Sequence, residues 1–168
     1  MRIFLIGFMG CGKTTLGKKL AQKMGYSFID LDHELERAVG TTVSEYFSEK
    51  GEATFRSLEK EMLNTLHYPT NCIVSTGGGT PCFFDNMEFM NRNGITIYIE
   101  MSPAALAKRL EYGKYKRPLI ANMDEAEMIT FIKNKVVERN PFYQRSFLTV
   151  NGLNITPAQV RDELFQVF

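Results

Sequence analysis

The residues GFMGCGKTT, from Gly7 to Thr15, place three glycines, a lysine and two hydroxyl groups directly behind an apolar run at residues 2–6. They fit the pattern G-x-x-x-x-G-K-[ST], which cradles nucleotide phosphates where a strand passes through a loop into a helix. Glycine permits the dihedrals and the close approach that this requires, and the helix beginning near Lys13 adds its positive dipole end. The nucleotide-binding residues predicted from this loop are Gly10, Cys11, Gly12, Lys13, Thr14 and Thr15.

Two carboxylates follow in FIDLDHE, where Asp30 and Asp32 are two residues apart. If both lie at the end of a strand, a period of two directs them to one face at the carboxyl edge of the sheet. The Thr14 hydroxyl is expected to ligate Mg²⁺. One of the acids could hold the hydrated metal opposite Thr14, and the other could accept a hydrogen bond from a substrate hydroxyl. The alternative is an ordinary acid cluster in which Asp32 caps the next helix.

Candidate anion-binding groups are spread over the rest of the chain. In GEATFRSLE, Arg56 is followed by Glu59 on the same helix face, and the planar guanidinium suits a carboxylate; the alternative is a surface ion pair. Three glycines, Gly77–Gly79, suggest that backbone approaches a ligand. Arg117 lies in KYKRPLI, where a mobile segment could close over the transferring phosphate. Arg139, in VVERNPFY, is either a second ligand-binding cation or a helix C-terminal charge.

The elements that must position these groups alternate regularly along the chain. Five short apolar runs separated by helix-length segments predict a parallel sheet covered by helices on both faces. Helix signals agree, since TVSE at residues 42–45 reads as a capping box and proline follows a hydroxyl at residues 102–103 and 156–157. The segment 32–66 is predicted to be a helical substrate-binding insertion, and 112–122 a lid. The five runs are RIFLI, SFIDL, CIVST, ITIYIE and FLTVN.

Composition limits the class of protein. A chain of 168 residues suits a single domain, residues 1–168, and a net charge of +1 gives no basic field for nucleic acid or a membrane surface. No run approaches the ~18 apolar residues of a membrane span. Three cysteines without zinc-like spacing favour reduced thiols and a cytoplasmic protein. The GTPase strings NKxD and DxxG are absent, so a small kinase is the simplest class of enzyme.

Taken in order, the segments GFMGCGKTT, DLD, GEATFRSLE, STGGG, KRPL and ERNPFY resemble the shikimate kinase family over residues 2–147. The resemblance implies ATP-dependent phosphorylation of the 3-hydroxyl of shikimate, a step toward chorismate and the aromatic amino acids. It also implies a three-layer P-loop NTPase core similar to nucleoside-monophosphate kinases, with five parallel strands, a helical substrate-binding insertion and a lid. Its cofactor is Mg²⁺, its substrates are shikimate and ATP, and a monomer is expected.

The resemblance also implies roles for individual residues. Asp32 would bind the substrate hydroxyls, Arg56 and Arg139 would clamp its carboxylate, and Gly78 would give a backbone N–H. Arg117 would touch the ATP phosphates and Asp30 would belong to the magnesium shell. Lys13, Asp32 and Arg117 are therefore the predicted catalytic residues.

The chain departs from the family in the loop before the last helix. Many members carry a basic residue there, but VNGLNITP at residues 150–157 has none. Adenine would then be held by Arg109, or by backbone and Asn154. Two other functions stay open at this point. One is another small-metabolite kinase, such as a gluconate-type kinase, and the other is a catalytically idle nucleotide-binding protein.

Overall fold

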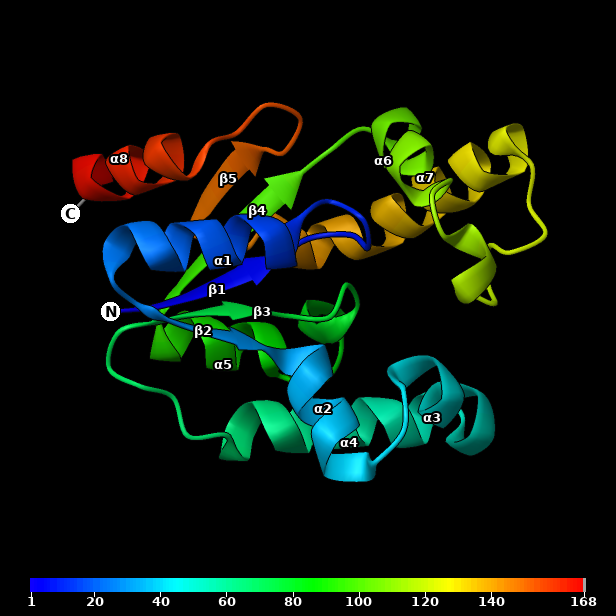
Figure 1. Cartoon of the computed structure of the whole chain (residues 1–168), viewed down its shortest axis with the longest axis horizontal. Coiled ribbons are helices and arrows are strands. Elements are labelled where there is room, and N and C mark those ends of the chain that lie inside the picture. Colours follow the sequence, from blue (N-terminus) through cyan, green and yellow to red (C-terminus); the bar gives the residue numbers. More distant parts are fainter. Residues whose placement is uncertain (168) are drawn as a thin grey trace.

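A computed structural model describes residues 1–167, and within them lies a five-stranded sheet in the order β2-β3-β1-β4-β5. Every neighbouring pair of strands is parallel, so the predicted sheet is confirmed (Figure 1). The strands begin or end within one residue of the predicted runs. Their bounds are β1 (Arg2–Ile6), β2 (Ser27–Asp30), β3 (Cys72–Ser75), β4 (Ile95–Glu100) and β5 (Leu148–Asn151).

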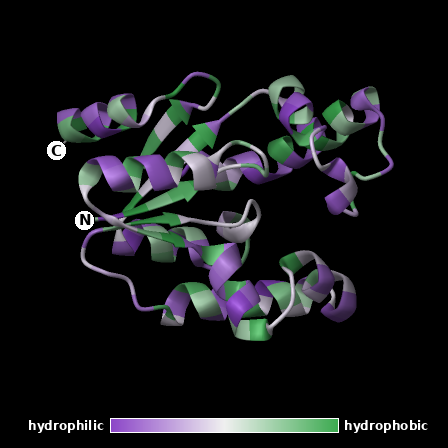
Figure 2. Cartoon of the chain, in the orientation of Figure 1, coloured by the Kyte–Doolittle hydropathy of each residue, from purple (hydrophilic) through white to green (hydrophobic). Residues whose placement is uncertain are grey.

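Helices cover both faces of this sheet, because successive side chains of each strand point to opposite sides. In β1, Ile3 and Leu5 pack into a cluster with residues of α1, α6, α7 and α8, whereas Phe4 and Ile6 pack into a second cluster with α4 and α5. Figure 2 shows the strands as the most hydrophobic part of the ribbon. The helices are α1 (Lys13–Met24), α2 (Leu31–Val39), α3 (Val43–Lys50), α4 (Glu52–Thr65), α5 (Asn86–Asn93), α6 (Pro103–Leu110), α7 (Glu125–Tyr143) and α8 (Pro157–Val167).

Two regions project from the core. The segment 32–66 contains α2, α3 and α4 and no strand, as its pattern predicts, and it forms the lower body in Figure 1. The capping box at the start of α3 is present, since Thr42 and Glu45 bond each other's backbone N–H groups. Residues 112–122 lie on the opposite side with α6 and α7 and form turns around one short 3₁₀ helix, η2 (Lys114–Lys116).

One local prediction was wrong. Asp30 is the last residue of β2, but Asp32 lies in the first turn of α2, so strand alternation does not relate the two acids. The helix cap is also Asp30 rather than Asp32, because its carboxylate accepts a hydrogen bond from the N–H of His33. The N-cap preference for a short acidic side chain ends the strand one residue earlier than the apolar pattern suggests. None of the helices in residues 1–167 has the length and apolarity needed to cross a bilayer.

Candidate active site

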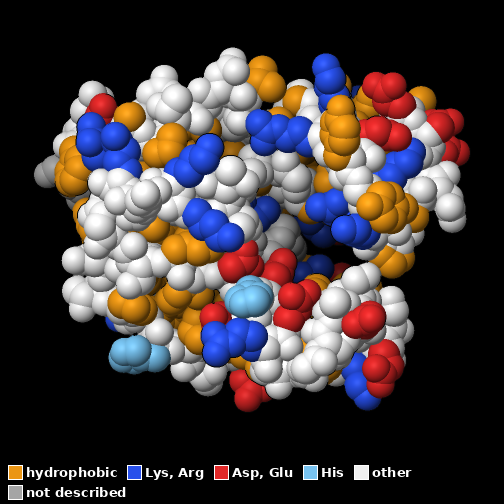
Figure 3. Space-filling model, viewed as in Figure 1, with side chains coloured by type: hydrophobic (Ala, Val, Ile, Leu, Met, Phe, Trp, Pro, Cys, Tyr) orange, Lys and Arg blue, Asp and Glu red, His pale blue; other side chains and the backbone are white. Residues whose placement is uncertain are grey.

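Two adjoining cavities open at the carboxyl ends of the strands, the edge where open α/β sheets bind ligands. One, of about 500 Å³, is lined by the phosphate loop, Asp30, Ser75, Arg109 and Arg117. The other, of about 330 Å³, is lined by residues of α3, α4, α7 and the triple glycine. Met9, Asp32 and Gly78 line both cavities, so a ligand in one can reach a ligand in the other. Figure 3 shows a hollow between the two projecting regions, with Lys and Arg gathered above it and Asp and Glu below.

The phosphate loop needs its glycines. Gly7, Gly10 and Gly12 all have positive φ, at 145°, 83° and 98°, in a region that other residues rarely adopt. Gly12 precedes the first residue of α1, so the N–H groups of that helix face the larger cavity. Lys13 lines this cavity, but its ammonium donates to the carbonyl oxygens of Gly7 at 2.7 Å and Phe8 at 3.1 Å. The lysine is therefore held against its own loop.

Side-chain oxygen atoms of Thr14, Asp30 and Ser75 lie close together beside the phosphate loop. The Thr14 hydroxyl donates to Asp30 Oδ2 at 2.7 Å and lies 3.3 Å from the hydroxyl of Ser75. Hydroxyl and carboxylate oxygens are ligands that Mg²⁺ accepts, and Mg²⁺ usually takes few protein ligands and keeps water or phosphate oxygens. Residues 1–167 contain no group of three or more His, Cys, Asp or Glu side chains that could hold a metal. Ser75 was not predicted, although its place as the last residue of β3 is a usable signal.

The Asp32 carboxyl group lies between the cavities and is partly buried. Burial, followed by the nearby carboxylates of Glu59 and Asp30, raises its pKa from 3.8 to about 6, while the ammonium of Lys13 acts in the opposite direction. A carboxylate with such a pKa is ionised at neutral pH and is a better proton acceptor than an exposed aspartate.

Arg56 is only 7% exposed, and its ion pair with Glu59 is buried rather than on the surface. Nη1 donates to Glu59 Oε1 at 3.0 Å, and Nη2 lies 3.5 Å from Glu52 Oε1. The guanidinium carbon also lies 4.2 Å from the centre of the Phe83 ring. Its Nε atom is buried without a hydrogen-bond partner in the described part of the chain. Since a buried cation is costly unless its donors are used, Arg56 is suited to bind an anion from the cavity.

Gly78 and Arg139 line the same cavity. The Nη1 atom of Arg139 would be 3.5 Å from a Cβ atom placed on Gly78, and the guanidinium carbon lies 5.4 Å from the Phe8 ring centre. The buried Tyr143 hydroxyl donates to the Gly78 carbonyl oxygen at 2.5 Å. The structure thus brings Asp32, Gly78 and the two arginines to one cavity from four separate segments. Lys135 also lines this cavity and was not predicted.

The two remaining arginines lie beside the phosphate loop. Arg117 lines the cavity of the phosphate loop. Arg109 donates to the carbonyl oxygens of Cys11 at 3.2 Å and Gly152 at 3.3 Å. It also lines a smaller cavity of about 140 Å³ that continues from the loop toward residues 152–157. Asn154 does not line that cavity, so Arg109 is the better placed of the two groups considered for adenine.

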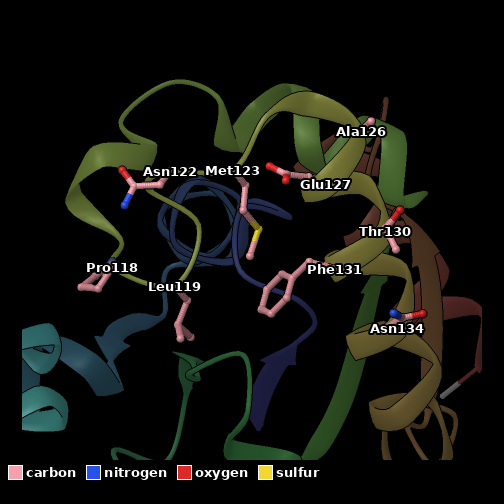
Figure 4. A pocket seen from close by; sticks show the side chains of 9 residues that line it. All are labelled: Pro118, Leu119, Asn122, Met123, Ala126, Glu127, Thr130, Phe131 and Asn134. Atoms are coloured by element: carbon pink, nitrogen blue, oxygen red, sulfur yellow. The ribbon is translucent and has the colours of Figure 1, made fainter.

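A further cavity, of about 760 Å³, lies between residues 118–123 and α7 (Figure 4). Its side chains include Met123 and Phe131, and Glu127 is its one charged residue. Leu119 and Phe131 line both this cavity and the 330 Å³ cavity, so they separate the two. Because no cation lines it, this space is not a candidate for the phosphate chemistry.

Comparisons with known proteins agree on one family. A family model described as shikimate kinase matches residues 9–168. A curated shikimate kinase of Parabacteroides distasonis is 46% identical over 162 residues, which cover 96% of this chain and 94% of the relative. One of Phocaeicola vulgatus is 50% identical over 145 residues, 86% of this chain and 83% of the relative.

Solved structures give the same result. The crystal structure of shikimate kinase from Bacteroides thetaiotaomicron has a TM-score of 0.91 at 43% identity, covering 99% of this chain and 98% of that one. Shikimate kinase from Acinetobacter baumannii, in complex with shikimate, has a TM-score of 0.86 at 30% identity, covering 99% and 91%.

Proposed function

The chain belongs to the shikimate kinase family, and we propose that it transfers the γ-phosphoryl group of ATP to the 3-hydroxyl of shikimate. The product is shikimate 3-phosphate, an intermediate toward chorismate and the aromatic amino acids. The observation that carries the proposal is that two arginines and an aspartate line one cavity, which shares Asp32 with the cavity of the phosphate loop. Acceptor and nucleotide can therefore meet at Asp32.

The acceptor cavity matches the chemistry of a small polyol acid. Arg56 and Arg139 present planar guanidinium groups, which bind a carboxylate through two parallel hydrogen bonds. The Gly78 N–H is a further donor, and the Asp32 carboxylate accepts hydrogen bonds from hydroxyl groups. With its acid end on the arginines, shikimate would direct a hydroxyl toward Asp32 and the phosphate loop.

Phosphoryl transfer then depends on the position of the acceptor hydroxyl and on the cations around the transferred phosphoryl group. The acceptor oxygen forms a bond to the γ-phosphorus as the bond to the ADP oxygen breaks, and the hydroxyl proton passes to Asp32. The loop N–H groups and Lys13 stabilise charge on the transferred group, and Arg117 adds a second cation. For this, Lys13 exchanges its bonds to the Gly7 and Phe8 carbonyls for phosphate oxygens.

The side-chain oxygen atoms of Thr14, Asp30 and Ser75 fit a magnesium ion. Thr14 and Asp30 would hold it, Asp30 directly or through water, with Ser75 close by. When bound, Mg²⁺ neutralises phosphate charge. The Thr14–Asp30 hydrogen bond keeps both oxygens together, and Asp30 is also anchored by the N–H of His33.

We also propose that residues 1–168 act as one kinase domain. In it, residues 32–66 bind the acceptor and residues 112–122 close over the phosphates. We expect a monomer that does not bind nucleic acid or membranes. The free cysteines Cys11, Cys72 and Cys82 are consistent with a reducing compartment, the cytoplasm.

A coupled assay with Mg-ATP and shikimate, quinate or gluconate as acceptor tests the function. We expect kcat/KM for shikimate to exceed that for either alternative by at least ~100-fold, since a site built for particular polar groups discriminates strongly. Preference for gluconate would identify a related small-metabolite kinase. Heat of Mg-ATP binding without phosphoryl transfer to any acceptor would identify an idle nucleotide-binding protein.

A further inference from the structure

Thr80, directly after the triple glycine, is fully buried and uses all of its polar groups. Its N–H donates to the Gly77 carbonyl at 3.2 Å, its hydroxyl donates to Glu59 Oε2 at 2.7 Å, and its carbonyl accepts from Asn86 Nδ2 at 2.9 Å. None of these atoms touches the acceptor cavity, because Thr80 does not line it. The residue is therefore placed to act through its neighbours.

The first neighbour leads to Arg56. Glu59 is fully buried, and its two carboxylate oxygens have different partners: Oε1 accepts from Arg56 and Oε2 accepts from Thr80. A buried carboxylate that loses one donor is destabilised and tends to rotate toward its other partner. Loss of the Thr80 hydroxyl would therefore change how Glu59 faces the guanidinium.

The second neighbour leads to Gly78. The Gly77 carbonyl accepts a hydrogen bond from the Thr80 N–H at 3.2 Å. The Thr76 hydroxyl lies 3.3 Å from the same carbonyl oxygen, but its shorter bond is to the Leu5 carbonyl at 3.0 Å. The Gly77 carbonyl shares a planar peptide unit with the N–H of Gly78, so holding one sets the direction of the other. A Cβ atom on Gly77 would lie 2.8 Å from Glu59 Oε2 and 2.9 Å from the Thr80 hydroxyl. Glycine at this position is what lets Glu59 and Thr80 meet.

We propose that Thr80 is a positioning residue that couples the Arg56 guanidinium to the Gly78 N–H and sets their spacing for the acceptor. Thr80 holds the guanidinium through Glu59 and the Gly78 N–H through the Gly77 carbonyl. The proposal rests on the proposed function, in which the Arg56 guanidinium and the Gly78 N–H both bind the acceptor. It predicts that the Thr80 hydroxyl affects the binding of shikimate and not that of the nucleotide. The hydrogen-bond partners of Thr80 are Glu59, Gly77 and Asn86, and none of them lines the phosphate-loop cavity.

Three variants separate this role from a merely structural one. Thr80→Val removes the hydroxyl with little change of shape, and Thr80→Ser restores it. Thr96→Val is the matched control, because Thr96 is also fully buried and its hydroxyl both donates to Asn91 Oδ1 at 2.7 Å and accepts from the Phe147 N–H at 3.0 Å. Thr96 lies in β4 and lines none of the cavities described above. Thermal unfolding of each variant shows that the form assayed is folded, and Thr80→Ala replaces Thr80→Val if the latter is unfolded.

In steady-state assays we expect Thr80→Val to raise KM for shikimate by about 10-fold or more, with KM for Mg-ATP within 2-fold of the parent. Thr80→Ser should recover KM for shikimate to within about 3-fold, and Thr96→Val should lower the melting temperature without changing either KM. An unchanged KM for shikimate in Thr80→Val, an equal rise for Mg-ATP, or an equal effect of Thr96→Val would overturn the proposal. The parent is assayed first: if it fails to phosphorylate shikimate, the proposed function falls and the role of Thr80 with it. A parent that is active beside an unaffected Thr80→Val refutes the role of Thr80 alone.

Discussion

Replacing Gly79 with alanine should damage acceptor binding through a single methyl group. A Cβ atom at this position would lie 2.5 Å from Arg56 Nη2, 2.6 Å from Nη1 and 2.8 Å from Cζ. The backbone itself can accept alanine, because φ is −92° and ψ is −11°. The strain therefore falls on the guanidinium, which is buried, paired with Glu59 at 3.0 Å and packed on Phe83.

The size of the effect follows from the distance. Heavy atoms pack at about 3.5 Å or more, so the Arg56 guanidinium must move by roughly 1 Å away from the new methyl group. That movement takes it out of the position in which its present contacts hold it. A misplacement of about 1 Å in a binding group can cost up to ~100-fold in rate or binding, which corresponds to about 2.7 kcal/mol. We expect KM for shikimate to rise by about 10- to 100-fold, with KM for Mg-ATP within about 2-fold.

Gly25→Ala provides the opposite control. Gly25 has a φ of 67°, and apart from its chain neighbours no atom lies within 4 Å of the place that a Cβ atom would take. Alanine there therefore strains the backbone by about 1 kcal/mol without touching the site. Steady-state kinetics and thermal unfolding of both variants separate the two effects. If Gly79→Ala keeps the shikimate KM of the parent, or if Gly25→Ala raises it equally, the close packing of Gly79 on Arg56 does not position the acceptor.

Four further predictions concern the remaining groups. Lys13→Ala should lower kcat by ~100-fold or more; activity within threefold of the parent would contradict its phosphate role. Arg56→Lys and Arg139→Lys should each raise KM for shikimate sharply, because lysine lacks the planar fork, and parent-like kinetics in both would exclude the carboxylate clamp. Deleting residues 113–118 should reduce kcat but leave shikimate binding, measured by calorimetry, largely intact; unchanged turnover would exclude a lid. Asp32→Asn should abolish transfer yet stabilise the fold at pH 8. Since the pKa of Asp32 is raised from 3.8 to about 6, the folded protein holds this proton more tightly and loses stability as the pH rises between those values. The gain, about 1 to 2 kcal/mol because the partly exposed carboxylate is screened, should disappear below about pH 4 in thermal unfolding; a variant that is less stable at pH 8 would refute the buried-charge explanation.

Local sequence patterns are enough to predict the order of the elements and the nucleotide half of the site. The phosphate loop is contiguous, so its glycines, Lys13 and Thr14 can be recognised without knowing the fold. The apolar runs and cap residues likewise depend on neighbours a few positions away, and all five runs form strands. The family resemblance extended this to the acceptor residues, which come together in one cavity.

The way in which those residues are held depends on contacts between distant segments. Pattern reasoning placed Asp30 and Asp32 on one strand, whereas a helix begins between them. Both acids nevertheless line the cavity of the phosphate loop. The Arg56–Glu59 pair is local in the chain, but its burial is not, because segments from elsewhere in the fold cover it. The hydroxyl of Ser75 beside Thr14 and the bond from Thr80 to Glu59 join residues from separate segments. Local sequence encodes backbone conformation, but the burial of a charge and the partner of a hydroxyl depend on which distant segments pack against it, and that is set when the layers close over the sheet.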